Sequence, residues 1–120
     1  MVIVDAANVV GSRPTGWWRD RAGAAAGLVA GVRASAAASR LETPVVVVLE
    51  GAARQGAAEG ESEGVTVVHA PGEGDDTMVA VAEGASGRVT LVSADRGLAA
   101  RCRALGCDVV GPTWLLDKLA

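Results

Sequence analysis

Five short runs of apolar residues, rich in valine, recur along the chain and constrain its fold more than any other feature. They lie at residues 2–4, 45–49, 65–68, 89–92 and 109–110. Within each run hydrophobic residues follow one another and do not alternate with charged ones. This pattern is typical of strands that are covered on both faces, as in a parallel sheet flanked by helices.

Helix-like segments separate most of these runs, at residues 17–38, 76–85, 94–105 and 114–119. Strands that alternate with helices predict an α/β fold. We expect a three-layer α/β/α, Rossmann-like sandwich, with a mainly parallel sheet of about five strands and right-handed crossovers. Residues 51–64 break the alternation, because four glycines and three glutamates predict a polar loop with at most a weak helical turn at 52–58.

The size and composition of the chain narrow the class of protein. A chain of 120 residues predicts a single domain, 1–120, because two would each approach the ~50-residue lower limit. Three tryptophans are the only aromatic residues, which argues against folds that stack RNA bases on rows of Phe and Tyr. Cys102 and Cys107 lack zinc-ligand spacing, so we expect free thiols.

Neither a membrane span nor a signal peptide is expected. No apolar run approaches the ~18 residues of a transmembrane helix, and no basic segment precedes the first apolar run. We therefore expect a cytoplasmic protein with no membrane partner.

Charge is distributed unevenly behind a formal net charge of −3. Residues 1–40 hold five arginines against two acids, whereas residues 41–87 hold one arginine against nine acids. Residues 88–120 hold five basic groups against three acids. A polyanion could meet the two basic segments if the fold brings them together.

Carboxylates follow three of the predicted strands. Asp5 ends the first, Asp75 and Asp76 come shortly after the third, and Asp95 follows the fourth. Ligands of an open parallel sheet bind outside the carboxyl ends of its strands, so we expect these side chains at one edge. Grouped carboxylates raise one another's pKa unless a cation neutralises them, and Mg²⁺ prefers such oxygen ligands. The chemistry suggested is metal-dependent hydrolysis of a phosphodiester.

Structural roles for the same residues stay open beside this hypothesis. Asp75, Asp76 and Asp95 stand at helix starts, where Asp is favoured for capping and dipole reasons alone. Asp5 is the carboxylate for which we favour function, because it ends a buried apolar strand with no cap evident. Asn8 is interpreted as a turn residue or as a donor to Asp5. His69 is interpreted as structural rather than as a catalytic base.

The strand-end residues resemble the motifs of NYN domains, a branch of the PIN-like ribonuclease superfamily. Residues 4–11, Val-Asp-Ala-Ala-Asn-Val-Val-Gly, resemble the opening Asp-x-x-Asn signature. Residues 92–96, Val-Ser-Ala-Asp-Arg, resemble the Ser-x-Asp motif, and residues 74–77, Gly-Asp-Asp-Thr, are similar to the middle acidic motif. The resemblance covers nearly the whole chain in order and spacing, and it implies a PIN-like, Mg²⁺- or Mn²⁺-dependent ribonuclease that acts on RNA.

The resemblance also implies roles for individual residues. Asp5 and Asp95 match best as metal ligands, with Asn8 orienting Asp5 or a metal-bound water. In the middle motif we expect Asp76 to be the ligand, because Val79 and Ala80 then share one helical face, and Asp75 to cap the helix. Asp20 is the candidate for a fourth acidic residue, although an ion pair with a neighbouring arginine or a helix-dipole contribution explains it slightly better.

Basic and aromatic residues near the predicted site are candidates for holding single-stranded RNA. Arginine matches phosphate oxygens bidentately, and tryptophan stacks bases. The predicted RNA-binding set is Arg13, Arg19, Arg21, Arg96, Trp17 (or Trp18) and Ser93, of which Ser93 is also expected to hydrogen-bond to the acidic cluster. Plain packing of one tryptophan beside arginine stems explains the aromatic pair equally well.

Two other functions compete with the nuclease. One is a PIN-like domain that binds RNA without cutting it. The other is a protein-interaction module, because residues 112–117, Pro-Thr-Trp-Leu-Leu-Asp, are similar to the last helix of BRCT domains. Neither a phosphate-binding Gly-x-x-x-x-Gly-Lys loop nor a dinucleotide fingerprint is present. A homodimer or a regulatory protein partner stays open.

Overall fold

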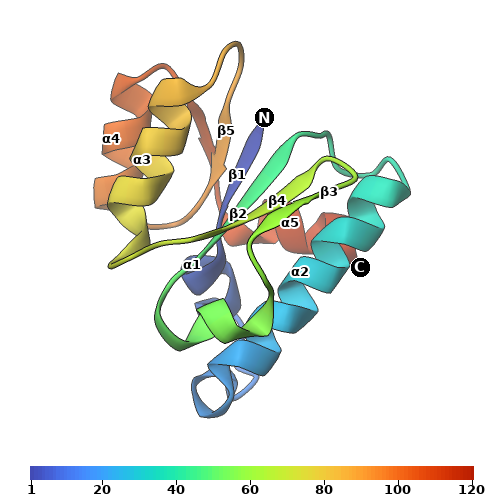
Figure 1. The fold of residues 1–120 in the computed structure, drawn as a ribbon. Coiled ribbons are helices and arrows are strands. Elements are labelled where there is room, and N and C mark those ends of the chain that lie inside the picture. Colours follow the sequence, from blue (N-terminus) through green and yellow to red (C-terminus); the bar gives the residue numbers. More distant parts are fainter.

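The computed structural model describes residues 1–120, and a six-stranded sheet lies at its centre (Figure 1). The strand order is β3-β4-β2-β1-β5-β6. Only β3 runs antiparallel to its neighbour, and the other pairs are parallel. The bounds are β1 (Val2–Asp5), β2 (Val45–Leu49), β3 (Gly60–Ser62), β4 (Val65–His69), β5 (Thr90–Val92) and β6 (Asp108–Val110). The predicted α/β class with a mainly parallel sheet is confirmed, but the sheet has six strands rather than about five.

Five α-helices and two 3₁₀ helices connect the strands. They are α1 (Ala6–Gly11), η1 (Trp17–Arg19), α2 (Arg21–Ala37), η2 (Gly51–Gly56), α3 (Gly74–Gly84), α4 (Arg96–Ala104) and α5 (Pro112–Leu119). The expected helix at 17–38 is in fact η1 followed by α2. In the segment expected as a polar loop, the helical turn expected at 52–58 corresponds to η2, whereas the edge strand β3 was not expected. Helix α1 was not expected from the sequence.

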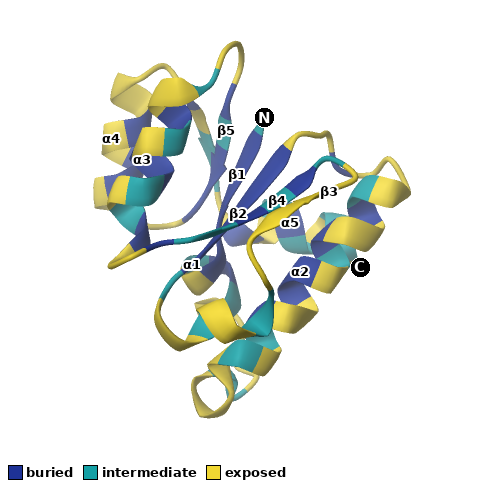
Figure 2. Ribbon diagram, viewed as in Figure 1, coloured by how far each residue is buried: buried dark blue, intermediate teal, exposed yellow.

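Helices pack on both faces of the sheet, over two separate hydrophobic cores (Figures 1 and 2). On one face, alternate residues of the strands meet α1, α2 and α5, for example Val4 and Val47 against Val29. On the other face, Ile3 and Val46 pack with residues of α3 and α4. Both faces of β1 and β2 are thus buried, which explains why these strands are continuous apolar runs.

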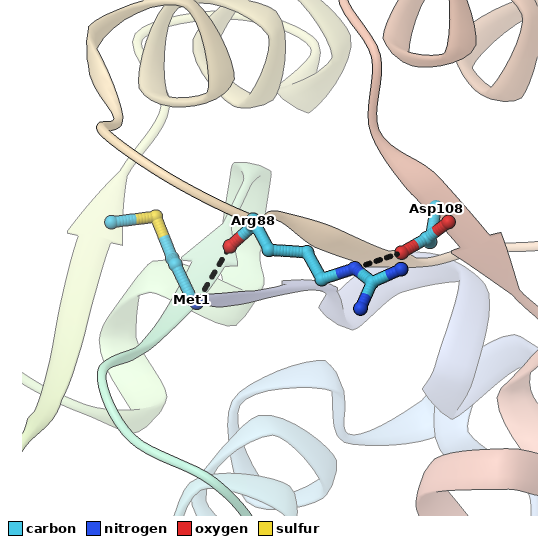
Figure 3. Close-up of polar contacts among 3 residues, drawn as sticks. All are labelled: Met1, Arg88 and Asp108. Atoms are coloured by element: carbon cyan, nitrogen blue, oxygen red, sulfur yellow. Dashed lines mark hydrogen bonds and ion pairs between the residues drawn. The ribbon is translucent and has the colours of Figure 1, made fainter.

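Polar contacts link neighbouring parts of the sheet at the end where β1 begins (Figure 3). The amino group of Met1 donates to the carbonyl of Arg88 at 3.0 Å, and Arg88 Nε donates to Asp108 Oδ2 at 3.1 Å. The ion pair is exposed, so it contributes little to stability. Arg88 and Asp108 thus pair with each other near the amino ends of the strands, whereas Asp5 lies at the carboxyl end of β1.

The remaining expectations from the sequence concern α5, the thiols and the membrane. Leu115 of α5 is fully buried in the core, and Lys118 Nζ lies 4.6 Å from the centre of the Trp114 ring, so this segment packs as an ordinary core helix. Cys102 and Cys107 are buried free thiols, as predicted, and burial raises the pKa of Cys102 to about 11. No helix combines the length and the apolar character needed to cross a bilayer.

Candidate acidic site

The strand order changes direction at β1. The chain moves from β1 to β2 and β4 on one side and then crosses to β5 on the other, so the carboxyl ends of β1 and β5 form the switch point. In open parallel sheets this is where ligands bind. Because side chains alternate along a strand, Asp5, Glu50 and Ser93 fall on the same face as Ile3, Val48 and Leu91, which pack in the core beneath α3 and α4.

Asp5 lies buried at this switch point, with 5% of its surface exposed. Its Oδ2 accepts a hydrogen bond from Ser93 Oγ at 2.8 Å, and its Oδ1 accepts from the backbone N–H of Asn8 at 3.3 Å. The second contact makes Asp5 the N-cap of α1. The expectation that no cap explains Asp5 was therefore wrong, because the short helix α1 begins directly after the strand.

Hydrogen bonds connect this carboxylate to the start of α4. Ser93 Oγ also accepts from the backbone N–H of Asp95 at 3.0 Å, and Asn8 Oδ1 accepts from the backbone N–H of Ala94 at 2.7 Å. Asn8 is in helix α1 and does not have the left-handed conformation of a turn residue. Its side chain holds the segment after β5 rather than Asp5 itself. Ser93, itself 3% exposed, makes the predicted bond to the acidic cluster.

Asp95 is exposed and caps α4, where its Oδ1 accepts from the backbone N–H of Leu98 at 2.9 Å. Its structural role as an N-cap is therefore real. A carboxylate oxygen has more than one lone pair, so capping leaves Asp95 able to bind a cation. The capping and functional hypotheses are compatible at this residue.

Helix α3 brings Asp75, rather than Asp76, toward Asp5 and Asp95. Asp76 is 89% exposed at its side chain, and its Oδ1 accepts from Arg101 Nη1 at 2.9 Å. Asp75 is half-buried and close enough to Asp95 and Asp5 to interact electrostatically with both. The expectation that Asp75 caps α3 was wrong, because Glu73 takes the N-cap position, and the Glu73 side chain forms no capping bond.

Glu50 joins this group and was not recognised from the sequence. It follows β2 directly, and its Oε2 accepts from the backbone N–H of Gly74 at 3.3 Å, at the start of α3. A Cβ atom at Gly74 would lie 3.4 Å from Glu50 Oε1 and 3.1 Å from Met78 Cε, so the closer contact at this position is with Met78. The signal that could have found Glu50 is its place at the end of the run 45–49, the same argument that found Asp5.

The carboxylates of this acidic cluster, Asp5, Glu50, Asp75 and Asp95, influence one another. Burial is the main cause that raises the pKa of Asp5, and Asp75 and Glu50 raise it further, while the bonds from Ser93 and Asn8 oppose the rise. Burial also raises the pKa of Asp75, with contributions from Asp95 and Glu73, and Arg101 opposes it. A bound cation would relieve this repulsion.

The structure gives Asp20 a capping role and does not bring it into the acidic cluster. Its Oδ1 accepts from the backbone N–H of Gly23 at 2.8 Å, so it is the N-cap of α2. His69 is also in a structural position: its Nε2 is 2.7 Å from the carbonyl oxygen of Ala57, and its backbone N–H donates to Glu59.

The predicted RNA-binding arginines lie on the surface and form no ion pair with a carboxylate. Arg21 and Arg19 stand over Trp17 and Trp18, at 5.2 and 5.8 Å from the ring centres. Arg96 is the first residue of α4, next to Asp95. Arg13 lines a separate groove between α1, α2 and α5. The charge of these side chains is therefore not neutralised by a carboxylate of the protein.

The donor atoms of the cluster suit one mode of divalent-metal binding and not another. No three His, Cys, Asp or Glu side chains converge closely enough to hold one ion among them. Mg²⁺ commonly binds through one or two carboxylates, several waters and the phosphates of a substrate. Asp5, Asp75 and Asp95 supply only oxygen donors. The arginine that opposes the rise in the pKa of Asp75 is Arg101, which pairs with Asp76. One or two of these carboxylates therefore fit this second mode of binding.

Comparison of the chain with protein-family models, with curated protein sequences and with solved structures found no match.

Proposed function

We propose that this protein is a PIN-like, metal-dependent ribonuclease that hydrolyses phosphodiester bonds of single-stranded RNA. The observation that carries the proposal is the buried carboxylate of Asp5 at the switch point of a mainly parallel sheet, bonded to Ser93 of the Ser-x-Asp segment. The order of the three motifs along the chain and the helices on both sheet faces agree with a Rossmann-like, three-layer PIN fold.

Each residue of the acidic cluster has a role in this proposal. One or two of the Asp5, Asp75 and Asp95 carboxylates would hold Mg²⁺ or Mn²⁺ together with water and a substrate phosphate, and Glu50 adds negative charge beside them. The metal, when bound, polarises the phosphodiester and supplies the nucleophilic water at neutral pH. Asn8 and Ser93 fix the start of α4 against Asp5, so that Asp95 stays at the same edge. The unpaired arginines Arg19, Arg21 and Arg96 bind flanking phosphates.

Incubation of the purified chain with a labelled single-stranded RNA tests the proposal. We expect cleavage in Mn²⁺ or Mg²⁺, none in a chelator, and none by the Asp95→Asn variant. Asp117→Asn, an exposed substitution on α5, is the matched control and should cleave like the unmodified chain. RNA binding without cleavage in any divalent ion would contradict the enzymatic proposal.

That negative outcome is the prediction of a second candidate, a PIN-like domain that binds RNA and does not cut it. One observation favours it: no three acidic side chains converge on a single point. A protein-interaction module of BRCT type has weaker support, because the segment that suggested it serves as a core helix through Leu115. It would bind its partner equally well with Asp5→Asn.

A further inference from the structure

A cavity of about 430 Å³ opens beside the acidic cluster. Its walls come from α1, the beginning of α2, η2 and the loop between β4 and α3. Ala6 and Ala7, which directly follow Asp5, line it, and so does Glu50 of the acidic cluster. The cavity and the acidic cluster therefore share a wall. Its volume falls within the ~300–1,000 Å³ of pockets that enclose small ligands or parts of larger ones.

The ring of Trp17 forms one side of this cavity. Gly11 lies next to the ring, since a Cβ atom there would be in ordinary van der Waals contact with it at 3.6 Å. The Arg21 guanidinium is 5.2 Å from the ring centre, and the Trp18 ring stands edge-on at 6.0 Å. Trp17 is half-buried and lines the cavity, whereas Trp18 is 55% exposed and does not line it. A half-buried indole at a cavity is a surface on which a base can stack.

The opposite wall, formed by η2, is fixed by close packing against α2. A Cβ atom at Gly56 would lie 2.3 Å from the carbonyl oxygen of Ala22 and 2.9 Å from the backbone nitrogen of Ala26. Only glycine allows the two backbones to come this close. The contact holds Ala53 and Arg54 of η2 in position along the cavity.

Charged groups at the cavity can both donate and accept hydrogen bonds. Arg54 donates from Nε to the carbonyl of Gly51 at 3.1 Å and from Nη1 to the carbonyl of Ala70 at 3.4 Å, and it has no carboxylate partner. Its other N–H groups stay available. Glu73 occupies the N-cap position of α3 without forming a capping bond, so its carboxylate is available as an acceptor.

A nucleobase matches this combination of surfaces. Its aromatic face suits the indole and the apolar walls, and its edge carries both N–H donors and acceptors for the carboxylate and the guanidinium. A purely apolar ligand would bury the charged groups without hydrogen-bond partners, which is costly.

We propose that the cavity binds one base of a single-stranded RNA, stacked on Trp17 with its polar edge at Arg54 and Glu73. This inference rests on the proposed function for the identity of the ligand as RNA. It adds a subsite that places one nucleotide next to the phosphate at the acidic cluster. In this proposal the other nucleotides of the strand contact the protein through their phosphates only.

Binding of a fluorescently labelled single-stranded oligoribonucleotide to the full chain, measured in a chelator, tests the subsite. Loss of one base stack weakens binding by about 10- to 100-fold, so we expect that loss for both Trp17→Ala and Trp17→Leu. The matched control is Trp114→Leu, a half-buried indole on α5 that does not line the cavity, and it should bind like the unmodified chain. Equal binding by the Trp17 and Trp114 variants would overturn the proposal.

A change in the RNA gives the same test without altering the protein. We use a series of oligonucleotides that each carry one abasic residue. At a single position in the series, the missing base should weaken binding by the unmodified chain about 10- to 100-fold. Trp17→Ala should be insensitive to that position, because the stack is already lost. If every position costs the same, or none does, no base subsite exists.

The chelator separates this proposal from the nuclease proposal. Base-dependent binding without cleavage in any metal would contradict the nuclease and support the subsite. Cleavage in Mn²⁺ with binding that ignores Trp17 and the abasic position would overturn the subsite and support the nuclease. Failure to bind RNA at all would contradict both.

Discussion

At the scale of single residues, two opposing effects act on the Asp5 carboxylate: burial disfavours its charged form, and hydrogen bonds favour it. Its carboxylate is 5% exposed, and burial raises its pKa, so the folded chain holds this charge at a cost. Two hydrogen bonds offset part of that cost, from Ser93 and from the backbone of Asn8. A buried carboxylate whose pKa is raised by its surroundings is typical of functional sites.

Asp5→Asn should be at least as stable as the unmodified chain at pH 7, because the neutral amide avoids the desolvation of a buried charge. The pKa of Asp5 is raised in the folded state, so its contribution to stability is fully present below the unfolded pKa of 3.8 and is lost as the pH rises through the folded value. The advantage of the variant should therefore shrink on acidification. Chemical denaturation at several pH values measures it, and an Asp5→Asn variant that is less stable than the unmodified chain at every pH would contradict the account.

Ser93→Ala should destabilise the fold by about 1–3 kcal/mol, since it leaves the buried Asp5 carboxylate and the Asp95 N–H without their partner. Because the Ser93 bond lowers the pKa of Asp5, its loss should raise that pKa further.

Ser35→Ala is the matched control for Ser93→Ala. Ser35 is equally buried, but its hydroxyl donates to the carbonyl of Lys118, at 2.9 Å, far along the chain from the acidic cluster. Both variants should lose stability in denaturant unfolding, and only Ser93→Ala should change RNA cleavage. Equal effects of the two on cleavage would mean that Ser93 acts only through stability.

At the scale of elements, the first turn of α3 decides which acidic residue faces the site. Sequence reasoning chose Asp76 from the apolar positions that follow it, whereas the structure pairs Asp76 with Arg101 of α4 at the surface. Two residues adjacent on a helix point about 100° apart, so an error in which helix face is turned to the site exchanges their roles. The sequence places the start of the helix at 76, and the structure places it at Gly74.

Asp75→Asn should reduce cleavage by about 10- to 100-fold or more, as expected for loss of a group that holds or orients a metal. Asp76→Asn is its natural comparison, since it removes only an exposed ion pair, and its cleavage rate should stay close to that of the unmodified chain. Single-turnover cleavage of RNA by the two variants measures the difference. A larger loss for Asp76→Asn would restore the assignment made from the sequence.

The close packing of η2 on α2 gives a prediction that concerns stability alone. Gly56→Ala should destabilise the fold by about 1–3 kcal/mol, because its Cβ would overlap the backbone of α2. Gly27→Ala, in the same helix α2 with open space around it, should instead stabilise by about 0.5–1 kcal/mol. Thermal unfolding of the pair checks both signs, and a stable Gly56→Ala protein would show that this contact is loose.

At the scale of the whole molecule, the five valine-rich runs were enough to predict the mainly parallel sheet. Continuous runs such as 45–49 are readable because both faces of the strand are buried. Strand β3 escaped prediction because all three of its residues are exposed and it pairs only at the edge, with β4. Helix α1 is six residues long, too short for a periodic pattern to indicate it.

The candidate site was predictable in part for the same reason. Asp5 and Asp95 stand directly after apolar runs, so their place at the sheet edge followed from the sequence. Glu50 has an equivalent position but was hidden among the acids of the segment that follows it. Pairing between elements, such as Asp76 with Arg101 or Asn8 with the backbone of Ala94, depends on how α1, α3 and α4 pack, which a single sequence does not encode locally.

Titration of the full chain with Mn²⁺ in a calorimeter tests the central claim most directly, because it requires no knowledge of the RNA substrate. The account predicts that the unmodified chain and Asp117→Asn bind Mn²⁺ alike, and that Asp5→Asn, although at least as stable at pH 7, loses most of that binding. Mn²⁺ binding of equal strength by Asp5→Asn, or no Mn²⁺ binding by the unmodified chain, would contradict a metal-dependent site at this edge of the sheet.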